Sequence, residues 1–573
     1  MITRRSVRRL LAAAALSMLV AEGAALAADP LRLTKPVHAT REDQNPGRLY
    51  LAPALAIDPS DDLNVVAAFT EMRTNRCGLM RSTDGGETWR KLDASPSTGS
   101  YPFCLSQNRG EFQGQIAFGR NGTLYYALPG WDAQDAGNRG NSSLLVGRSS
   151  NLGDSWQTAI ARNNRGKQGD DQEWIRPVGS IAVDAGSASD DIVYVGYATN
   201  RRPSSPNAAP REPTVVVSTD GGRNFAPPVN LAATVFTDAN MRRQALSAVT
   251  TTIPTGSTTT TTTPPPGSRA ANPDQAVNFG GFQTVVTTDD RGNVYAAWGT
   301  NTANISPSPP SAIFVSRSSD QGKTWTSTQV APFSYKTGTF MRMKWSPKGG
   351  EQGSLHLTYS GTETPEIAGS GDIYYTRSTD GGRTWIPARN VTDDAPQALV
   401  GQYYPNLSIA PNGRVDLAFY DIRDDPGYRS NDVYYTYSED NGDTWSKNLR
   451  ITDQPIDRRM GVWSLNYDMT TPPAVASANA YAVFAWDDTR NSDPSVGDNS
   501  ALGGGLQDIY VANAQFTVVG GGASKVAKVI LAGVAGLVAV GLILLVVAMA
   551  TRSRSGAGPV RVPKSEKRPA RVS

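Results

Sequence analysis

The sequence predicts an all-β protein: a seven-bladed β-propeller of four-stranded antiparallel blades, followed by one C-terminal transmembrane helix. Two observations indicate the propeller. A turn phrase of the form S-x-D-x-G-x-T-W recurs six times, and alternating apolar runs flank each copy. Such self-similarity at blade-sized intervals is typical of radial repeat folds. A third observation, an uncharged run over residues 529–550, indicates the helix. A six-bladed ring with the last unit as an appendage is the alternative.

The chain begins with an export signal. Four arginines between positions 4 and 9 precede the short apolar run "LLAAAALSMLV", and Ala-Leu-Ala at 25–27 fits a small-residue cleavage site. This pattern predicts a signal peptide over residues 1–27. The stretch "TRRSVRR" fits a twin-arginine signal equally well, so both export routes remain open.

The turn phrase organises residues 28–518. Its third position is occupied by Asp84, Asn151, Asp220, Asp320, Asp380 and Asp440, at steps of 67, 69, 100, 60 and 60 residues. Asp and Ser side chains can bond the backbone of their own turn, Gly adopts angles that other residues resist, and Trp covers the hairpin. The phrase is therefore interpreted as a structural turn. The second and third copies are degenerate.

Each repeat unit contains two hairpins. The run "DIYYTRS" precedes the fifth phrase and "TWIPARNV" follows it, while "NLSIAPNGRVDLAFYD" supplies two further strands ahead of the sixth. Alternating β-branched and aromatic residues bounded by Gly and Asp predict strands. A seventh unit, from 474 to 519, lacks the phrase and has three strands. The N-terminal "LRLTKPV" resembles the fourth-strand sequence "LRITDQP" (449–455), so we expect it to complete the last blade and close the ring.

The 100-residue step contains an insertion. Residues 250–270 are rich in Thr and Pro, a composition that cannot bury a core. They are predicted to form a disordered loop that leaves the propeller.

The C-terminus predicts a membrane anchor. Residues 529–550 form 22 uncharged residues, which is long enough to cross a bilayer. Lys525 and Lys528 precede them, and the tail at 551–573 holds seven basic residues and one acid. Positive charge favours the cytoplasmic side. The expected location is the cell membrane, with a single span, an extracytoplasmic N-terminal propeller and a cytoplasmic tail.

Charge and composition exclude some partners. The chain has a net charge of +3, of which the signal contributes +3, Lys525 and Lys528 +2 and the tail +6, leaving −8 for residues 28–524. An acidic body argues against a nucleic-acid partner. With only two histidines and two cysteines in the chain, no metal site and no cofactor are predicted. In an exported chain, Cys77 and Cys104 are expected to form a disulfide.

The six phrases match the Asp box, also called the BNR repeat. On these residues, the chain from about 30 to 517 resembles the sialidase-like Asp-box β-propeller superfamily, which includes exo-α-sialidases and non-catalytic proteins. The resemblance implies that the Asp boxes lie on blade rims, away from any active site. It also implies an Arg-Ile-Pro motif before the first box, but here Ile-Arg-Pro occurs only at 175–177, after the second.

A second internal pattern suggests a ligand site. "TEMR" (70–73), "YDIR" (420–423) and "WDDTR" (486–490) each place an acid and an arginine at a strand end. Arg73, Arg423 and Arg490 are therefore candidates to converge on an anionic ligand, because guanidinium groups hold carboxylates in bidentate fashion. In the competing interpretation, each arginine pairs locally with Glu71, Asp421 or Asp487.

The functional prediction is a propeller that binds or processes glycans at the cell surface. As an enzyme it would be a glycoside hydrolase of the exo-α-sialidase type, with Tyr467 as a possible nucleophile and Glu351 or Glu363 as its base, although a structural tyrosine is the simpler interpretation. The alternative is a non-catalytic protein-binding or envelope-assembly propeller. Its partner would be a glycan or a surface protein; catalytic residues and oligomeric state are not predicted.

Overall fold

The computed structural model describes the strands and turns of residues 31–516. The described ranges are 31–41, 47–71, 76–97, 101, 104, 114–131, 142–164, 173–184, 190–201, 211–235, 283–299, 312–330, 340–361, 371–394, 400–425, 427, 429–461, 472–492 and 506–516. The predicted signal (1–27), insertion (250–270), span (529–550) and tail (551–573) lie outside them. Within these ranges, no helix has the length and apolar character needed to span a membrane.

Seven antiparallel sheets make up this part of the chain. The first three sheets are β3 (Tyr50–Ile57), β4 (Val65–Glu71), β5 (Arg76–Ser82) and β6 (Arg90–Leu92); β7 (Gln115–Phe118), β8 (Leu124–Trp131), β9 (Ser142–Ser149) and β10 (Gln157–Arg162); and β11 (Glu173–Asp184), β12 (Ile192–Arg201), β13 (Arg211–Ser218) and β14 (Val229–Asn230). The short helices η1 (Arg120–Gly122) and α2 (Leu231–Val235) lie between strands.

The remaining four sheets continue the same order. They are β15 (Val285–Thr288), β16 (Val294–Gly299), β17 (Ile313–Ser318) and β18 (Thr326–Val330); β19 (Met341–Ser346), β20 (Ser354–Gly361), β21 (Asp372–Ser378) and β22 (Arg389–Asn390); β23 (Gln402–Ile409), β24 (Val415–Asp421), β25 (Ser430–Ser438) and β26 (Leu449–Arg450), with β27 (Ile456–Asp457) beside β25; and β28 (Ala474–Ser477), β29 (Tyr481–Asp488), β30 (Asp508–Phe516) and β1 (Leu31–Leu33), with β2 (Val37–His38) also on β30.

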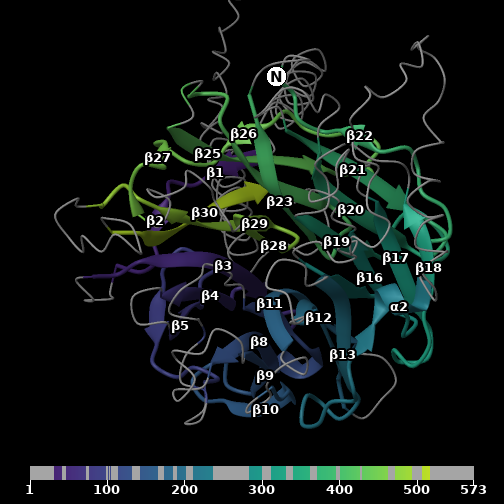
Figure 1. The fold of residues 1–573 in the computed structure, drawn as a ribbon. Coiled ribbons are helices and arrows are strands. Elements are labelled where there is room, and N and C mark those ends of the chain that lie inside the picture. Colours follow the sequence, from purple (N-terminus) through teal and green to yellow (C-terminus); the bar gives the residue numbers. More distant parts are fainter. Residues whose placement is uncertain are drawn as a thin grey trace, which may run out of the picture. The chain divides into compact units, whose positions relative to one another are not determined.

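The sheets form a ring around their first strands (Figure 1). Each innermost strand contacts the next along the chain, from β3 through β7, β11, β15, β19 and β23 to β28, and β28 contacts β3. The fold is therefore the predicted seven-bladed propeller, and the six-bladed alternative is wrong.

The N-terminal strand closes the ring. In the last sheet, β1 pairs antiparallel with β30, setting Leu31 opposite Phe516 and Leu33 opposite Ala514. The backbone N–H of Thr34 extends the pairing to the carbonyl of Asn513 at 2.8 Å. β30 would otherwise end the sheet with an unpaired edge, so this pairing protects it. The completion expected from "LRLTKPV" is confirmed.

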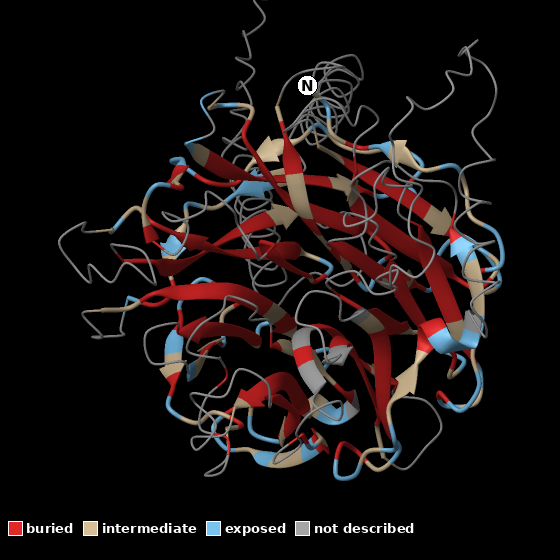
Figure 2. Cartoon of the chain, in the orientation of Figure 1, coloured by how far each residue is buried: buried red, intermediate tan, exposed pale blue. Residues whose placement is uncertain are grey.

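The core consists of the layers between neighbouring blades (Figure 2). One layer joins Tyr435 of the sixth sheet to Phe484 of the seventh, with ring centroids 4.7 Å apart in an edge-to-face arrangement. Trp486, fully buried, belongs to the same layer. Because both faces of a blade pack against neighbours, middle strands such as β4 and β24 are buried along their whole length, and the alternation of apolar and polar residues is less evident than in a sheet with a solvated face.

Candidate functional site

The repeated turn connects the third and fourth strands of six blades. In the fifth copy, Oδ1 of Asp380 accepts hydrogen bonds from the hydroxyl of Ser378 at 2.7 Å and the backbone N–H of Thr384 at 2.9 Å, while Oδ2 accepts the Thr384 hydroxyl at 2.6 Å. The Ser378 hydroxyl in turn accepts the N–H of Gly382 at 2.9 Å, and the Trp385 indole donates to the Gly382 carbonyl at 3.2 Å. The Asp380 carboxylate therefore bonds residues of its own turn and stabilises that turn.

The other copies repeat these bonds. Asp84, Asp320 and Asp440 each accept a Ser and a Thr hydroxyl in the same way. At Asp320 the Thr324 hydroxyl and backbone lower the pKa to about 2. In the degenerate copies, Asn151 donates to Ser155 and Asp220 accepts from the side chain of Asn224. The turn therefore has a structural role in all six blades.

The seventh blade has no such turn for a topological reason. Its third strand is β30 and its fourth is β1, which come from opposite ends of the chain, so no hairpin joins them. Instead, the side-chain amide of Asn513 on β30 donates to the carbonyl of Gly85 in the first turn at 2.8 Å.

Cys77 and Cys104 form a disulfide, with Cα atoms 5.7 Å apart. Cys77 lies on β5 and Cys104 lies between the first and second sheets. The bond therefore ties an inter-blade connection to the first blade.

Arg423 follows β24 and is held by two carboxylates. Its Nε donates to Oδ2 of Asp421 at 2.7 Å, and its Nη1 donates to Oδ1 of Asp393 at 2.7 Å. Asp393 belongs to the segment after the last strand of the preceding sheet. The guanidinium lies 4.6 Å above the Tyr434 ring. Burial raises the pKa of Asp421 to about 6 even though Arg423 opposes this shift.

Arg490 repeats this arrangement one blade later. Its Nη2 contacts Oδ2 of Asp488 at 2.8 Å, its Nη1 contacts Oδ1 of Asp453 in the preceding blade at 2.8 Å, and the guanidinium lies 4.1 Å from the Tyr510 ring centroid. The local partner is therefore Asp488 and not Asp487, which instead accepts from the Tyr420 hydroxyl and the Gln507 amide.

The correct partner follows from the turn geometry. Each arginine's own backbone N–H also bonds the acid two positions earlier, at 2.7 Å for Arg423 and Asp421 and 2.9 Å for Arg490 and Asp488. "WDDTR" has one more residue than "YDIR" between its first acid and the arginine, so this two-residue step selects the second acid.

The other candidates are only partly placed. Arg73, Tyr467 and Glu363 lie outside the described residues, so the convergence of Arg73, Arg423 and Arg490 and the tyrosine–glutamate pair stay predictions. Glu351 is exposed in the turn between β19 and β20, where its carbonyl accepts from Arg291. Since blade strands are antiparallel, this turn lies at the same blade end as the repeated turns, opposite the ends that carry Arg423 and Arg490.

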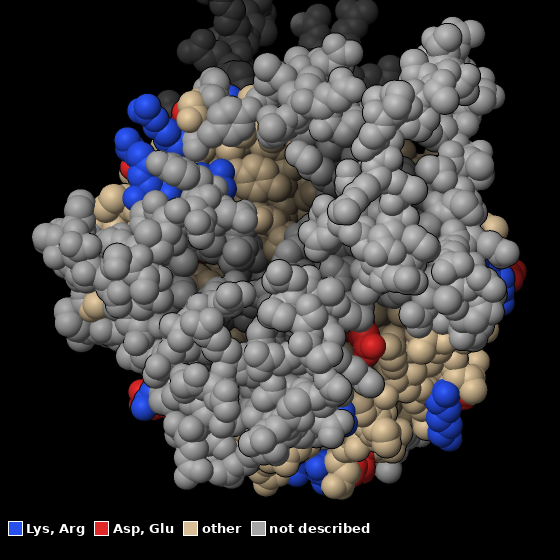
Figure 3. Space-filling model, viewed as in Figure 1, with Lys and Arg blue, Asp and Glu red and all other residues tan. Residues whose placement is uncertain are grey.

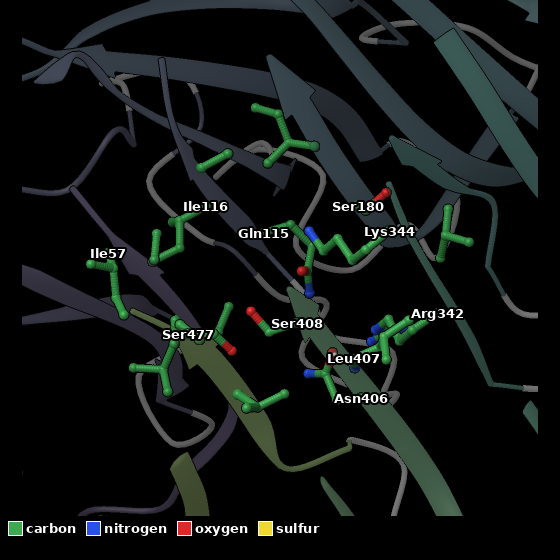
Figure 4. A pocket seen from close by; sticks show the side chains of 18 of the residues that line it. Ile57, Gln115, Ile116, Ser180, Arg342, Lys344, Asn406, Leu407, Ser408 and Ser477 are labelled. Carbon is green, nitrogen blue, oxygen red and sulfur yellow. Dashed lines mark hydrogen bonds between the residues drawn. The ribbon is translucent and has the colours of Figure 1, made fainter. Parts of the chain in front are cut away.

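A cavity of about 210 Å³ lies at the centre of the ring. Described residues from all seven innermost strands line it. They are residues 54–57, 115–117, 180–181, 285, 342–344, 406–408 and 475–477. Most of the lining is apolar, but Figure 4 shows the side chains of Gln115 and Lys344 reaching into the cavity, with Ser408 and Ser477 on other sides of it.

Two cations contribute to this cavity from β19. Arg342 is buried and donates to the side chain of Gln283 and, at 2.9 Å, to the carbonyl of Met341. Lys344 lies two residues further on, so both side chains leave the same side of the strand. Burial and the charge of Arg342 lower the pKa of Lys344 to about 8, so it remains mostly protonated at neutral pH.

The sequence interpretation missed this cavity. Its polar residues come from five of the seven innermost strands and share no motif. The available signal was the "MRMKW" stretch, in which two cations alternate with apolar residues inside a strand. Among the described residues, no group of three or more His, Cys, Asp or Glu side chains is placed to hold a metal ion.

Other charged side chains lie at the surface, on the face shown in Figure 3. Described basic side chains gather beside β27 at its edge. There, Arg459 pairs with Asp457 at 2.6 Å, with both side chains more than a third exposed. Of the two cations that line the cavity, Arg342 is buried and Lys344 is partly exposed.

No protein-family model matches the chain, and no curated protein matches it either. Solved structures similar to it include a protein of unknown function from Dyadobacter fermentans (12% identity, 85% of this chain and 100% of that chain covered, TM-score 0.41). A Hadza microbial sialidase (14%, 79% and 74%, 0.41) and the Penicillium chrysogenum α-L-arabinanase complexed with arabinobiose (15%, 68% and 94%, 0.39) are also similar. TM-scores this low carry no argument about function.

Proposed function

We propose that the chain is an exported, membrane-anchored propeller that binds or processes glycans at the cell surface, with exo-α-sialidase activity as its enzymatic form. The observation that carries this proposal is the central cavity, lined by all seven innermost strands. Apolar walls with a few convergent amide, hydroxyl and cationic groups are the usual make-up of a small-molecule site. The segments 1–27, 529–550 and 551–573 supply the export signal, the anchor and the cytoplasmic tail of this proposal.

One observation favours a non-catalytic role. None of the lining residues that the structure describes has a carboxylate, phenol or imidazole side chain. Most glycosidases need two carboxylates, and sialidases need a tyrosine nucleophile. A propeller that binds a glycan or a surface protein without cleaving it, or that serves in envelope assembly, is therefore the second candidate.

The test uses cells that produce the full-length chain, with cells lacking it as the control. Both are incubated with a fluorogenic sialoside, and the detergent-solubilised chain is applied to a glycan array. Fluorophore release supports the hydrolase, and glycan binding without release supports the non-catalytic form. If neither occurs, the glycan proposal is wrong.

The proposed orientation in the membrane has a separate test. Protease added to intact cells should remove a propeller epitope and spare a C-terminal one.

A further inference from the structure

The first strands β3 and β23 share one irregularity. Each has 8 residues with a proline at the fourth, Pro53 in β3 and Pro405 in β23. At this point the pairing of each strand with its neighbour shifts register. The residue before the proline has a left-handed backbone in both, with φ of 58° at Ala52 and 57° at Tyr404. The first and sixth blades therefore contain the same β-bulge.

A tyrosine is an unusual residue for this position. Left-handed backbone angles are uncommon for residues other than glycine, and more so for bulky side chains. Ala52 shows that the bulge itself needs no aromatic ring. Strained positions are concentrated in ligand sites, and bulges redirect side chains beside such sites. The bulge alone therefore does not account for the ring of Tyr404.

The Tyr404 ring belongs to an aromatic cluster that joins two blades. It meets the Phe340 ring edge-to-face with centroids 4.2 Å apart, and the Tyr403 ring edge-to-face with centroids 5.5 Å apart. Phe340 immediately precedes β19 of the fifth blade and is buried, whereas both tyrosines are partly exposed. The Tyr403 hydroxyl accepts a hydrogen bond from Nη1 of Arg458 at 2.7 Å. The cluster therefore has two partly exposed phenol rings with a guanidinium beside one of them.

This cluster borders the central cavity. Arg342, which lines the cavity, lies two positions after Phe340. Asn406, which also lines it, lies two positions after Tyr404. The rings therefore lie at the end of the cavity where β19 and β23 begin. The start of β23 pairs with the end of β24, so this is the blade end that carries Arg423, opposite the repeated turns.

These features together fit a sugar ring. A sugar has an apolar C–H face that can lie against an aromatic ring, and a rim of hydroxyl groups that need hydrogen-bond partners. Tyrosine offers a broad, rigid ring at little conformational cost. The amide and hydroxyl groups of the adjoining cavity suit the hydroxyl rim. Arg342 and Arg458 near the rings disfavour a cationic ligand.

We propose that Tyr404, supported by Tyr403 and Phe340, is a stacking platform for one sugar ring of a glycan at the end of the central cavity. The inference rests on the proposed glycan function and names a residue that sets its affinity. The strained bulge and the two neighbouring rings hold the Tyr404 ring in place, so the platform is formed before the glycan binds.

The test begins with the full-length wild-type chain in detergent on a glycan array. The glycan that gives the strongest signal is then titrated by calorimetry into wild type, Tyr404→Ala and Tyr404→Phe. Tyr404→Ala gives β23 the residue that β3 has in its bulge, so the bulge should persist. It should weaken binding about tenfold, because it removes one aromatic contact. Tyr404→Phe keeps the ring and should bind like wild type.

Two further variants separate binding from folding. Tyr404→Leu keeps apolar volume without the ring and should lose as much affinity as Tyr404→Ala. Tyr437→Ala is the matched control: this tyrosine is also partly exposed, packs edge-to-face on Phe516 and lies beside the repeated turn at the opposite blade end. It should lower the melting temperature and leave binding unchanged.

The outcomes distinguish this inference from the glycan function itself. Unchanged binding in Tyr404→Leu, or an equal loss in Tyr404→Ala and Tyr437→Ala, would overturn the platform and leave glycan binding standing. A wild type that binds no glycan would overturn both.

Discussion

The guanidinium of Arg490 lies 2.8 Å from the carboxylate of Asp453, and this contact fastens the last blade to the blade before it. Arg423 and Asp393 form the equivalent link one blade earlier, at 2.7 Å. Each arginine also holds an acid of its own blade. The acid-and-arginine pattern thus joins adjacent blades as well as stabilising its local turn.

Replacing Arg490 by Ala should lower the free energy of unfolding by about 3 kcal/mol, because Asp488 is fully buried and would lose its cation. Urea denaturation followed by tryptophan fluorescence measures the change. Arg459→Ala removes an exposed ion pair and should cost about 0–1 kcal/mol. Equal stabilities of the two variants would contradict the stabilising role of Arg490.

Replacing Asp380 by Ala should cost about 1–2 kcal/mol, since the turn loses the acceptor of several hydrogen bonds. Asp380→Asn should cost less. Its amide can donate to Thr384, as Asn151 donates to Ser155 at 2.9 Å in the second blade. Melting temperatures of the two variants test this order, and the reverse order would show that negative charge matters more than the bonding pattern.

The acid stability of the chain should depend on Asp508. Burial opposes its ionisation, but polar contacts from His38, Arg48 and Asn491 outweigh burial and lower its pKa to about 2. The unfolded pKa is about 3.9, so the stabilisation is complete above about pH 4 and is lost as the pH falls through about 2.

Asp508→Asn should therefore be less stable than the wild type by about 2 kcal/mol at neutral pH. This difference should shrink between about pH 4 and pH 2. Melting temperatures of both proteins across that range provide the test. A constant difference would mean that the carboxylate is not titrating there.

Reducing the disulfide between Cys77 and Cys104 should lower the free energy of unfolding by about 3 kcal/mol, given the 27-residue separation. Melting with and without a reductant measures the loss. The double variant Cys77→Ser, Cys104→Ser should melt like the reduced wild type and be insensitive to the reductant. A reductant effect that persists in this variant would assign the loss to another cause.

Deleting residues 28–36 removes β1 and should leave β30 with an open edge. We expect a lower melting temperature and a shift to higher oligomers, measured by light scattering. Deleting residues 250–270, the predicted disordered insertion, is the control and should change neither. A monomeric, equally stable β1 deletion would show that the ring does not need its closing strand.

The sequence was sufficient for the propeller because its repeats are local. Each turn phrase, such as that around Asp380, combines a hairpin signal with a fixed spacing, and the resemblance of "LRLTKPV" to "LRITDQP" correctly placed β1 in the last blade. The prediction of Asp487 as the partner of Arg490 was wrong by one residue. The true partner, Asp488, is identified by the hydrogen bond that it accepts from the backbone N–H of Arg490, which the sequence alone does not show.

The cavity could not be predicted in the same way. The cavity brings together Lys344, Gln115, Ser408 and Ser477 only because the seven first strands surround one axis. These residues lie too far apart in the sequence to form a recognisable motif. A lysine in a strand more often faces solvent, so the place of Lys344 in the cavity lining depends on the closed ring. The inter-blade contacts of Arg423 and Arg490 were missed for the same reason, since their second carboxylates come from the preceding blade.

The pairing of Leu31 with Phe516 also sets an order of events for folding. β1 is synthesised before the other strands of the propeller and its partner β30 after them. The ring therefore cannot close until nearly the whole propeller has been synthesised. Such distant contacts are slow to form, and unpaired edges are exposed to aggregation until they do. Under the proposed export, a route that carries unfolded chains would deliver an unclosed ring until β30 has crossed, whereas a route that carries folded proteins would act only after closure.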